Sequence, residues 1–166
     1  MSSLLFALAF VIVMILMYLG KYSGRIRAGG QQVLPAAPET VLGLLADWRT
    51  WPQWHLWLEP TETAPPLSGK DRLRWDEGFH GAGEARWADV GSGPAQRLQL
   101  RLRLLRPFSV RADIEMVLNP EGAGTLVRWR LTGRVAFALR AFATTVQRAL
   151  QFEMDHSLMQ LSLIHI

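Results

Sequence analysis

The chain of 166 residues contains no cysteine, which excludes disulfide bonds, thiol nucleophiles and cysteine metal sites. Its four histidines, His55, His80, His156 and His165, are widely separated. None of them has the close spacing of a helical metal site such as H-E-x-x-H. A glycine-rich phosphate loop is also missing. We therefore expect neither a metal site nor a cofactor.

Lysine is scarce, because Lys21 and Lys70 are the only two, and arginine carries most of the excess of 18 basic over 14 acidic residues. Most arginines alternate with apolar residues and are interspersed with acids, which is typical of a solvated strand face. We expect no nucleic-acid partner. Attraction to anionic lipid beside a membrane anchor is an expected secondary role.

The sequence offers few residues in arrangements typical of a catalytic site. His55 stands among tryptophans and could act as a general base, but a histidine on a helix surface is the preferred interpretation. Ser92 lies in Gly-Ser-Gly, which lacks the flanks of a nucleophile elbow and indicates a turn. Asp76 and Glu77 precede a glycine turn, where we expect solvated carboxylates. We assign no catalytic residue, and these observations favour a protein that is not an enzyme.

Charge is absent from Met1 to Gly20, and Leu4 to Leu19 is apolar throughout. With its flanks this run approaches the ~20 residues that span a bilayer. A signal peptide is the alternative, but it usually has a basic start, a shorter apolar core and small residues at a cleavage site. We predict a retained anchor over residues 1–20. A cleaved signal would instead make the protein periplasmic or secreted.

Basic residues follow the anchor at once, at Lys21, Arg25 and Arg27. By the positive-inside rule this flank places the domain in the cytoplasm, as part of a single-pass protein of the plasma (inner) membrane. Gly24, Gly29 and Gly30 predict that residues 21–32 form a flexible juxtamembrane linker.

Three runs with a period of two follow in the middle of the chain, at 97–104, where the period is strict, and at 110–118 and 126–133. They predict consecutive antiparallel strands with one buried and one wet face. On the wet face we expect Arg101 and Arg103 to neighbour Asp113 and Glu115. Shorter strands are predicted at 71–75 and 83–90.

A long helix is predicted from Phe137 onward, with an apolar stripe that includes Phe142, Val146 and Ala149. Gln147 and Gln151 are expected to face away from the stripe. A sheet with one apolar face needs a covering layer, and this helix is the largest amphipathic element left.

The segment Val33 to Trp57 predicts the end of a strand, a helix starting at Pro38, and a second short helix. Thr50 and Gln53 match a capping box for the latter. The segment carries Trp48, Trp51, Trp54 and Trp57. These rings are expected to be core, with a cavity mouth or a membrane-facing lip as the alternative.

These features resemble the START/SRPBCC superfamily of helix-grip proteins, which includes polyketide cyclase-like and lipid-transfer domains. The resemblance covers Val33 to Gln160, and its motifs are Ala37-Pro38-Glu39, Asp47-Trp48, Trp51-Pro52, Trp54, Trp75, Gly81, Gly83, Arg106-Pro107-Phe108 and Gly124 to Trp129. It implies an α+β fold: a curved antiparallel sheet wrapped on a long C-terminal helix, here preceded by one transmembrane helix. Function does not follow from it, since such folds host binding modules and enzymes alike.

The predicted domain spans 33–160, with a ligand cavity between sheet and helix. Its nominated lining is apolar: Trp75, Trp87, Leu98, Leu100, Leu102, Ile114, Met116, Val127, Trp129, Phe142 and Val146. The leading hypothesis is a membrane-tethered binding module for a hydrophobic small molecule or lipid. The alternatives are a cyclase- or dehydratase-type enzyme, and an accessory protein whose cavity is filled by its own side chains.

The last six residues, Leu161 to Ile166, read LSLIHI, which is one frame of a widely used transposon sequencing adapter, CTGTCTCTTATACACATC. We expect these residues to be non-native and the C-terminal helix to be truncated. An ordinary helix terminus is the alternative, and the underlying codons decide between the two.

Overall fold

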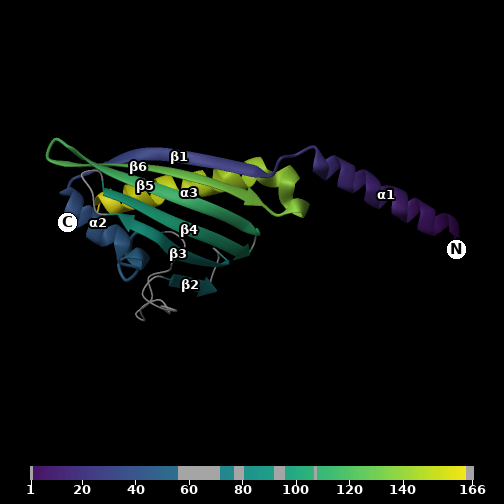
Figure 1. Cartoon of the computed structure of the whole chain (residues 1–166), viewed down its shortest axis with the longest axis horizontal. Coiled ribbons are helices and arrows are strands. Elements are labelled where there is room, and N and C mark those ends of the chain that lie inside the picture. Colours follow the sequence, from purple (N-terminus) through teal and green to yellow (C-terminus); the bar gives the residue numbers. More distant parts are fainter. Residues whose placement is uncertain (1, 56–71, 77–80, 92–95, 107, 164–166) are drawn as a thin grey trace.

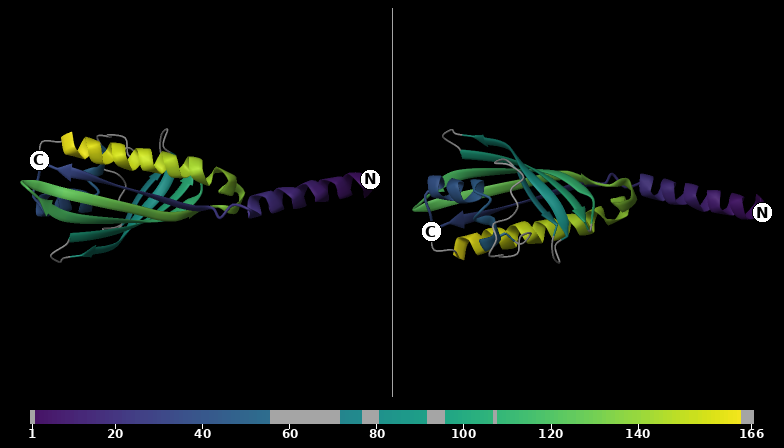
Figure 2. Two further views of the ribbon diagram at one scale, coloured as in Figure 1. Left: turned by 90° about the horizontal axis from the view of Figure 1, so that it is seen from above. Right: turned by 90° about the horizontal axis from the view of Figure 1, so that it is seen from below.

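The computed structural model describes residues 2–55, 72–76, 81–91, 96–106 and 108–163. Its centre is a six-stranded antiparallel sheet with strand order β1-β6-β5-β4-β3-β2. One face of the sheet is covered by the long helix α3, while helix α1 projects away from the sheet (Figure 1, Figure 2). The predicted α+β helix-grip fold is confirmed.

The elements in chain order are α1 (Ser2–Gly20), β1 (Arg25–Leu34), α2 (Pro38–Ala46), the 3-10 turn η1 (Trp51–Gln53), β2 (Arg72–Asp76), β3 (Ala82–Gly91), β4 (Gln96–Arg106), β5 (Val110–Glu121), β6 (Gly124–Val135), η2 (Phe137–Phe142) and α3 (Ala143–Leu163).

The two faces of the sheet follow the alternation predicted for β4, β5 and β6. Leu100 pairs with Ile114 and with Trp87, and Ile114 pairs with Leu131, so this cross-strand row presents apolar side chains to α3. The intervening arginines lie on the opposite, outer face. A period of two is sufficient to separate a buried from a wet face.

The predicted linker over 21–32 is wrong, because β1 begins at Arg25 and pairs with β6 along its whole length. Gly30 is not there for flexibility. A Cβ at that position would lie 2.8 Å from the indole Nε1 of Trp129 and 2.8 Å from Asp155 Oδ1. The glycine therefore leaves room for the large ring on the neighbouring strand, which is a common reason for glycine inside a strand.

Strand β1 is an edge of the sheet, and two glutamines of α3 pair with its outward backbone groups. Gln147 Oε1 accepts a hydrogen bond from the Arg27 N–H at 3.0 Å. Gln151 Oε1 accepts from the Gly29 N–H at 3.0 Å, and its Nε2 donates to the Gly29 carbonyl at 3.1 Å. The expectation that both glutamines face away was wrong. Because an unpaired edge is a template for unwanted strand pairing, their position protects the sheet.

Helix α3 begins later than predicted, and this changes which residues it buries. Residues Phe137–Phe142 form a 3-10 helix, and α3 proper starts at Ala143. A 3-10 helix has about three residues per turn, so the phase of the apolar stripe shifts where it meets the α-helix. Phe142 is 56% exposed and Ala149 is exposed, which contradicts their predicted burial. The buried stripe of α3 is Val146, Leu150, Met154, Ser157, Leu158 and Leu161.

The helix predicted from Pro38 is confirmed as α2, but the capping box at Thr50 is not formed. Thr50 Oγ1 instead donates to the carbonyl oxygens of Leu44 at 2.7 Å and Asp47 at 2.9 Å. These bonds satisfy carbonyls at the C-terminal end of α2. They fix the corner from which Trp51 of η1 enters the core.

Helix α1 is long and apolar enough to cross a membrane over Ser3–Gly20, and none of that stretch is buried within the structure. At its end the rings of Tyr18 and Tyr22 pack edge to face with centroids 5.4 Å apart. The hydrogen bond from the Tyr22 hydroxyl to that of Tyr18 raises the pKa of Tyr22. Length and composition fit both a membrane anchor and a signal sequence.

Candidate functional site

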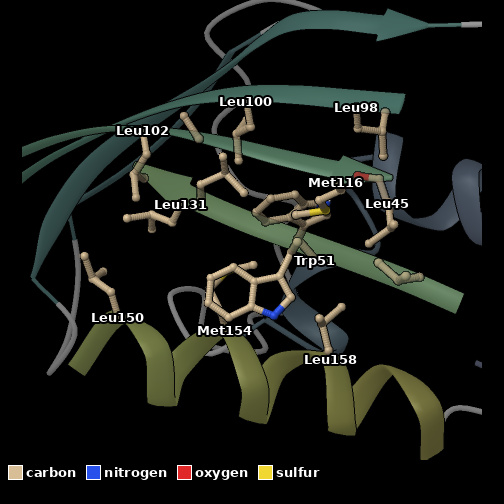
Figure 3. Close-up of a cluster of buried hydrophobic side chains, with 14 of the residues drawn as sticks. Leu45, Trp51, Leu98, Leu100, Leu102, Met116, Leu131, Leu150, Met154 and Leu158 are labelled. Atoms are coloured by element: carbon tan, nitrogen blue, oxygen red, sulfur yellow. Dashed lines mark hydrogen bonds between the residues drawn. The ribbon is translucent and has the colours of Figure 1, made fainter. Parts of the chain in front are cut away.

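The structure brings most of the nominated cavity residues together on the helix-facing side of the sheet, where several are seen pointing toward α3 (Figure 3). Trp87 is only half-buried but packs against the same core. Phe142 does not belong to the site, because its ring is exposed. The residues that lie in the core are Trp75, Leu98, Leu100, Leu102, Ile114, Met116, Val127, Trp129 and Val146.

Tryptophans of the α2–η1 corner close one end of this apolar interior. Trp48, Trp51 and Trp54 are buried, as expected for core residues. Trp48 stacks on Trp87 of β3, with ring centroids 4.7 Å apart and an angle of 25° between the planes. Trp51 contacts both Trp48 and Trp54, at centroid distances of 4.6 and 5.1 Å. Residues far apart in the sequence thus form one aromatic cluster.

The indole N–H groups of these rings differ in their hydrogen bonding. Trp51 Nε1 donates to the Leu45 carbonyl at 2.9 Å. The Nε1 atoms of Trp48, Trp87 and Trp129 are buried and have no acceptor among the residues that the structure describes. Burying a donor without a partner costs about 1–3 kcal/mol, and most buried polar groups in proteins are satisfied. Three buried indole donors are therefore without an acceptor among the described residues: those of Trp48 and Trp87 at the aromatic cluster, and that of Trp129 at the border between β1 and α3.

Trp129 lies beside a small polar group at the border between β1 and α3. Its Nε1 and Asp155 Oδ1 flank Gly30 from the same side. The other carboxylate oxygen, Asp155 Oδ2, accepts a hydrogen bond from Gln151 Nε2 at 2.7 Å. The chain of contacts from Gly29 through Gln151 to Asp155 ties α3 to β1 beside the Trp129 indole.

His55 is buried, with only 2% of its surface exposed, so its interpretation as a histidine on a helix surface was wrong. Its ring stacks on Trp51 with centroids 4.6 Å apart and planes 1° from parallel, and Trp54 lies at 5.1 Å. The backbone N–H of His55 donates to the Trp51 carbonyl at 2.7 Å, which turns the side chain inward. The sequence signal was its position directly after Trp54, within the tryptophan series.

The other polar candidates do not assemble into a site. Asp76 is exposed and forms an ion pair with Arg106. His156 is half-buried on α3, and its Nε2 lies 3.3 Å from the Nε2 of Gln160. Within the described ranges no three histidines or acids come close enough to hold a metal ion. Trp57, Glu77, His80, Ser92 and His165 fall outside the described residues.

Solved structures with the same arrangement of sheet and helix include a START superfamily protein from Mycobacterium smegmatis, with a TM-score of 0.63 at 18% identity over 82% of this chain and 94% of that one. A conserved protein from Geobacillus kaustophilus gives a TM-score of 0.64 at 15% identity, over 82% of this chain and 93% of that one. The di-domain ARO/CYC protein StfQ from the steffimycin biosynthetic pathway gives 0.63 at 10% identity, over 84% of this chain and 50% of that one.

No protein-family model and no curated protein sequence matches the chain. At these identities the likeness establishes the fold. The chain has the helix-grip fold of START-like proteins, with an apolar N-terminal helix in front of it.

Proposed function

We propose that the protein is a membrane-tethered module that binds a hydrophobic small molecule or lipid between the sheet and α3. The observation that carries this proposal is the set of buried indole donors without an acceptor in the described part of the chain, at Trp48, Trp87 and Trp129, which border a largely apolar interior. Small-molecule sites are typically apolar with a few polar groups that fix orientation. The ligand that fits is a largely apolar molecule with carbonyl or hydroxyl oxygens that accept hydrogen bonds.

Replacing Trp87 or Trp129 by Phe tests this proposal, because the change removes the donor and keeps an aromatic ring. Native mass spectrometry of the full chain purified from cells measures the retained ligand. We expect retention to weaken several-fold, as for the loss of a hydrogen bond worth about 1 kcal/mol. Protein stability should change little, since no protein acceptor among the described residues is lost.

Trp51→Phe is the matched control, because the Trp51 N–H already bonds the Leu45 carbonyl. It should lower stability by about 1 kcal/mol and leave ligand retention unchanged. Unchanged retention in Trp87→Phe and Trp129→Phe, with both proteins folded, would contradict the binding proposal. An accessory protein with a filled interior would then be the better description.

A cyclase- or dehydratase-type enzyme is the second candidate function, and buried His55 is the observation that favours it. Imidazole is the side chain best suited to proton transfer near neutral pH, and burial beside an apolar site is common for catalytic groups. The structural neighbours include an ARO/CYC protein of a biosynthetic pathway. Conversion of the retained molecule to a product of different mass by the wild type, but not by His55→Gln, would favour the enzyme.

Tethering with the domain in the cytoplasm is proposed from α1 and its basic flank at Lys21, Arg25 and Arg27. An alkaline phosphatase fusion after Gln160 reports the orientation, because this reporter requires export to be active. We expect an inactive fusion in the membrane fraction. Activity there would reverse the orientation, and release into the soluble fraction would indicate a cleaved signal sequence.

A further inference from the structure

The outer face of the sheet, opposite α3, contains a hollow of ≈ 980 Å³ that crosses all six strands. Its lining is strongly basic, with eight arginines against the two acids Glu84 and Asp113. We refer to it as the arginine hollow. Its arginines and acids belong to the other set of the strand alternation from the residues of the apolar interior, although the inward-facing Leu102 and Ala112 also border the hollow.

The strand register places arginines directly opposite one another across four strands. Arg25 pairs with Arg134, Arg134 pairs with Arg111, and Arg111 pairs with Arg103. Like charges directly opposite on a sheet face are destabilising. The sequence predicted that Arg103 would neighbour Asp113 or Glu115 of β5, but the register places it opposite Arg111 on that strand, and its acidic neighbour is Glu84 of β3. Three consecutive repulsive pairs indicate that the hollow is built for an anion.

The acids within reach neutralise only part of this charge. Glu84 pairs with Arg103 at 3.5 Å and with Arg74 at 3.6 Å, and Asp113 lies 4.0 Å from Arg101. Arg25, Arg111 and Arg134 form no ion pair within the described part of the chain. Farther along the same face the charges are compensated, as where Arg97 lies 3.4 Å from Glu115.

The arginine hollow is lined by the start of β1 and the end of β6. These strand ends lie at the end of the sheet that adjoins α1 (Figure 1). Arg25 follows the last residue of α1, Gly20, by only five positions. An extended chain spans at most ~3.6 Å per residue, so Arg25 is within ~18 Å of the end of α1. Basic residues gain about 1 kcal/mol each near an anionic leaflet, and this attraction falls off over a Debye length.

We propose that the arginine hollow binds the phosphate headgroups of anionic phospholipids in the membrane that holds α1, and so keeps the domain against the bilayer surface. This inference rests on the proposed retention of α1. Guanidinium groups suit the role because they form bidentate hydrogen bonds with phosphate oxygens. Bound phosphate also relieves the repulsion within the row formed by Arg25, Arg134, Arg111 and Arg103.

The test uses the full chain in neutral detergent, supplied with equal amounts of phosphatidylcholine and phosphatidylglycerol, and native mass spectrometry to count the lipids retained. The wild type should prefer phosphatidylglycerol. In the double variant Arg111→Gln/Arg134→Gln this preference should fall about 25-fold, if each arginine contributes about fivefold. Arg128→Gln/Arg130→Gln removes the same charge from β6 outside the hollow and should keep the preference.

Thermal unfolding at low salt supplies a second readout. If the arginine row only supported the fold, Arg111→Gln/Arg134→Gln would lower the melting temperature, whereas removing repulsion should leave it equal or higher. Equal retention of the two lipids by the wild type overturns the proposal, as does equal loss in both double variants. Displacement of phosphatidylglycerol by millimolar inorganic phosphate would assign the hollow to a soluble phosphorylated ligand instead. This experiment supplies the lipid in detergent, so it does not report whether α1 is cleaved in cells. Cleavage of α1 would be detected by the alkaline phosphatase fusion instead.

Discussion

Replacing Trp51 by Ala should lower the free energy of unfolding by about 3–5 kcal/mol, the usual cost of deleting a buried aromatic ring. The Trp51 side chain is fully buried and lies between the strands and α3 (Figure 3). It also stacks on His55 and bonds the Leu45 carbonyl. The substitution removes all of these contacts at once. Small domains have a total stability of about 5–15 kcal/mol, so the variant should lose a large fraction of its stability.

Urea unfolding followed by tryptophan fluorescence or circular dichroism measures the loss. Phe152→Ala is the matched control, because this aromatic residue of α3 is 67% exposed. Its effect should stay within about 0.5 kcal/mol. An equally small effect of Trp51→Ala would mean that the aromatic cluster does not support the fold, and the position of α2 against the sheet would have to be revised.

Gly133→Ala should destabilise the domain by about 1–3 kcal/mol, although alanine is a small change. A Cβ at this position of β6 would lie 2.5 Å from the Arg111 carbonyl oxygen and 2.9 Å from the Cα of Ala112. Both are atoms of the neighbouring strand's main chain. They cannot rotate away as a flexible side chain could, so the β5–β6 pair must move apart.

Gly43→Ala gives the opposite expectation and serves as the control. Gly43 lies within α2, and no atom comes within 4 Å of its added Cβ. Alanine is favoured over glycine in a helix by about 1 kcal/mol, so this variant should gain stability. Thermal unfolding of the two variants measures the expected loss of stability in Gly133→Ala and the expected gain in Gly43→Ala. A destabilised Gly43→Ala or a neutral Gly133→Ala would contradict the packing described for these elements.

The sequence determined those features that depend on local periodicity. Alternation along 97–104, 110–118 and 126–133 identified β4, β5 and β6 and sorted their residues between the two faces of the sheet. Pro38 marked the start of α2, and the uncharged N-terminus identified α1 as apolar on all sides. Residues of the candidate site were mostly predictable for the same reason, since Leu98, Met116 and Trp129 belong to one face.

Tertiary structure alone decided which residues become neighbours. A period of two assigns a face but not a register, so on the β5 side Arg103 lies opposite Arg111 and not beside Asp113 or Glu115, and its acidic partner is Glu84 of β3. Gly30 suggests a linker by residue type, but in the structure it leaves room for the Trp129 ring of the neighbouring strand. His55 is buried because Trp51 and Trp54 close around it, and Gln151 is engaged because β1 is an edge strand. Each of these outcomes depends on contacts between segments far apart in the chain, which form only when the strands and α3 pack together.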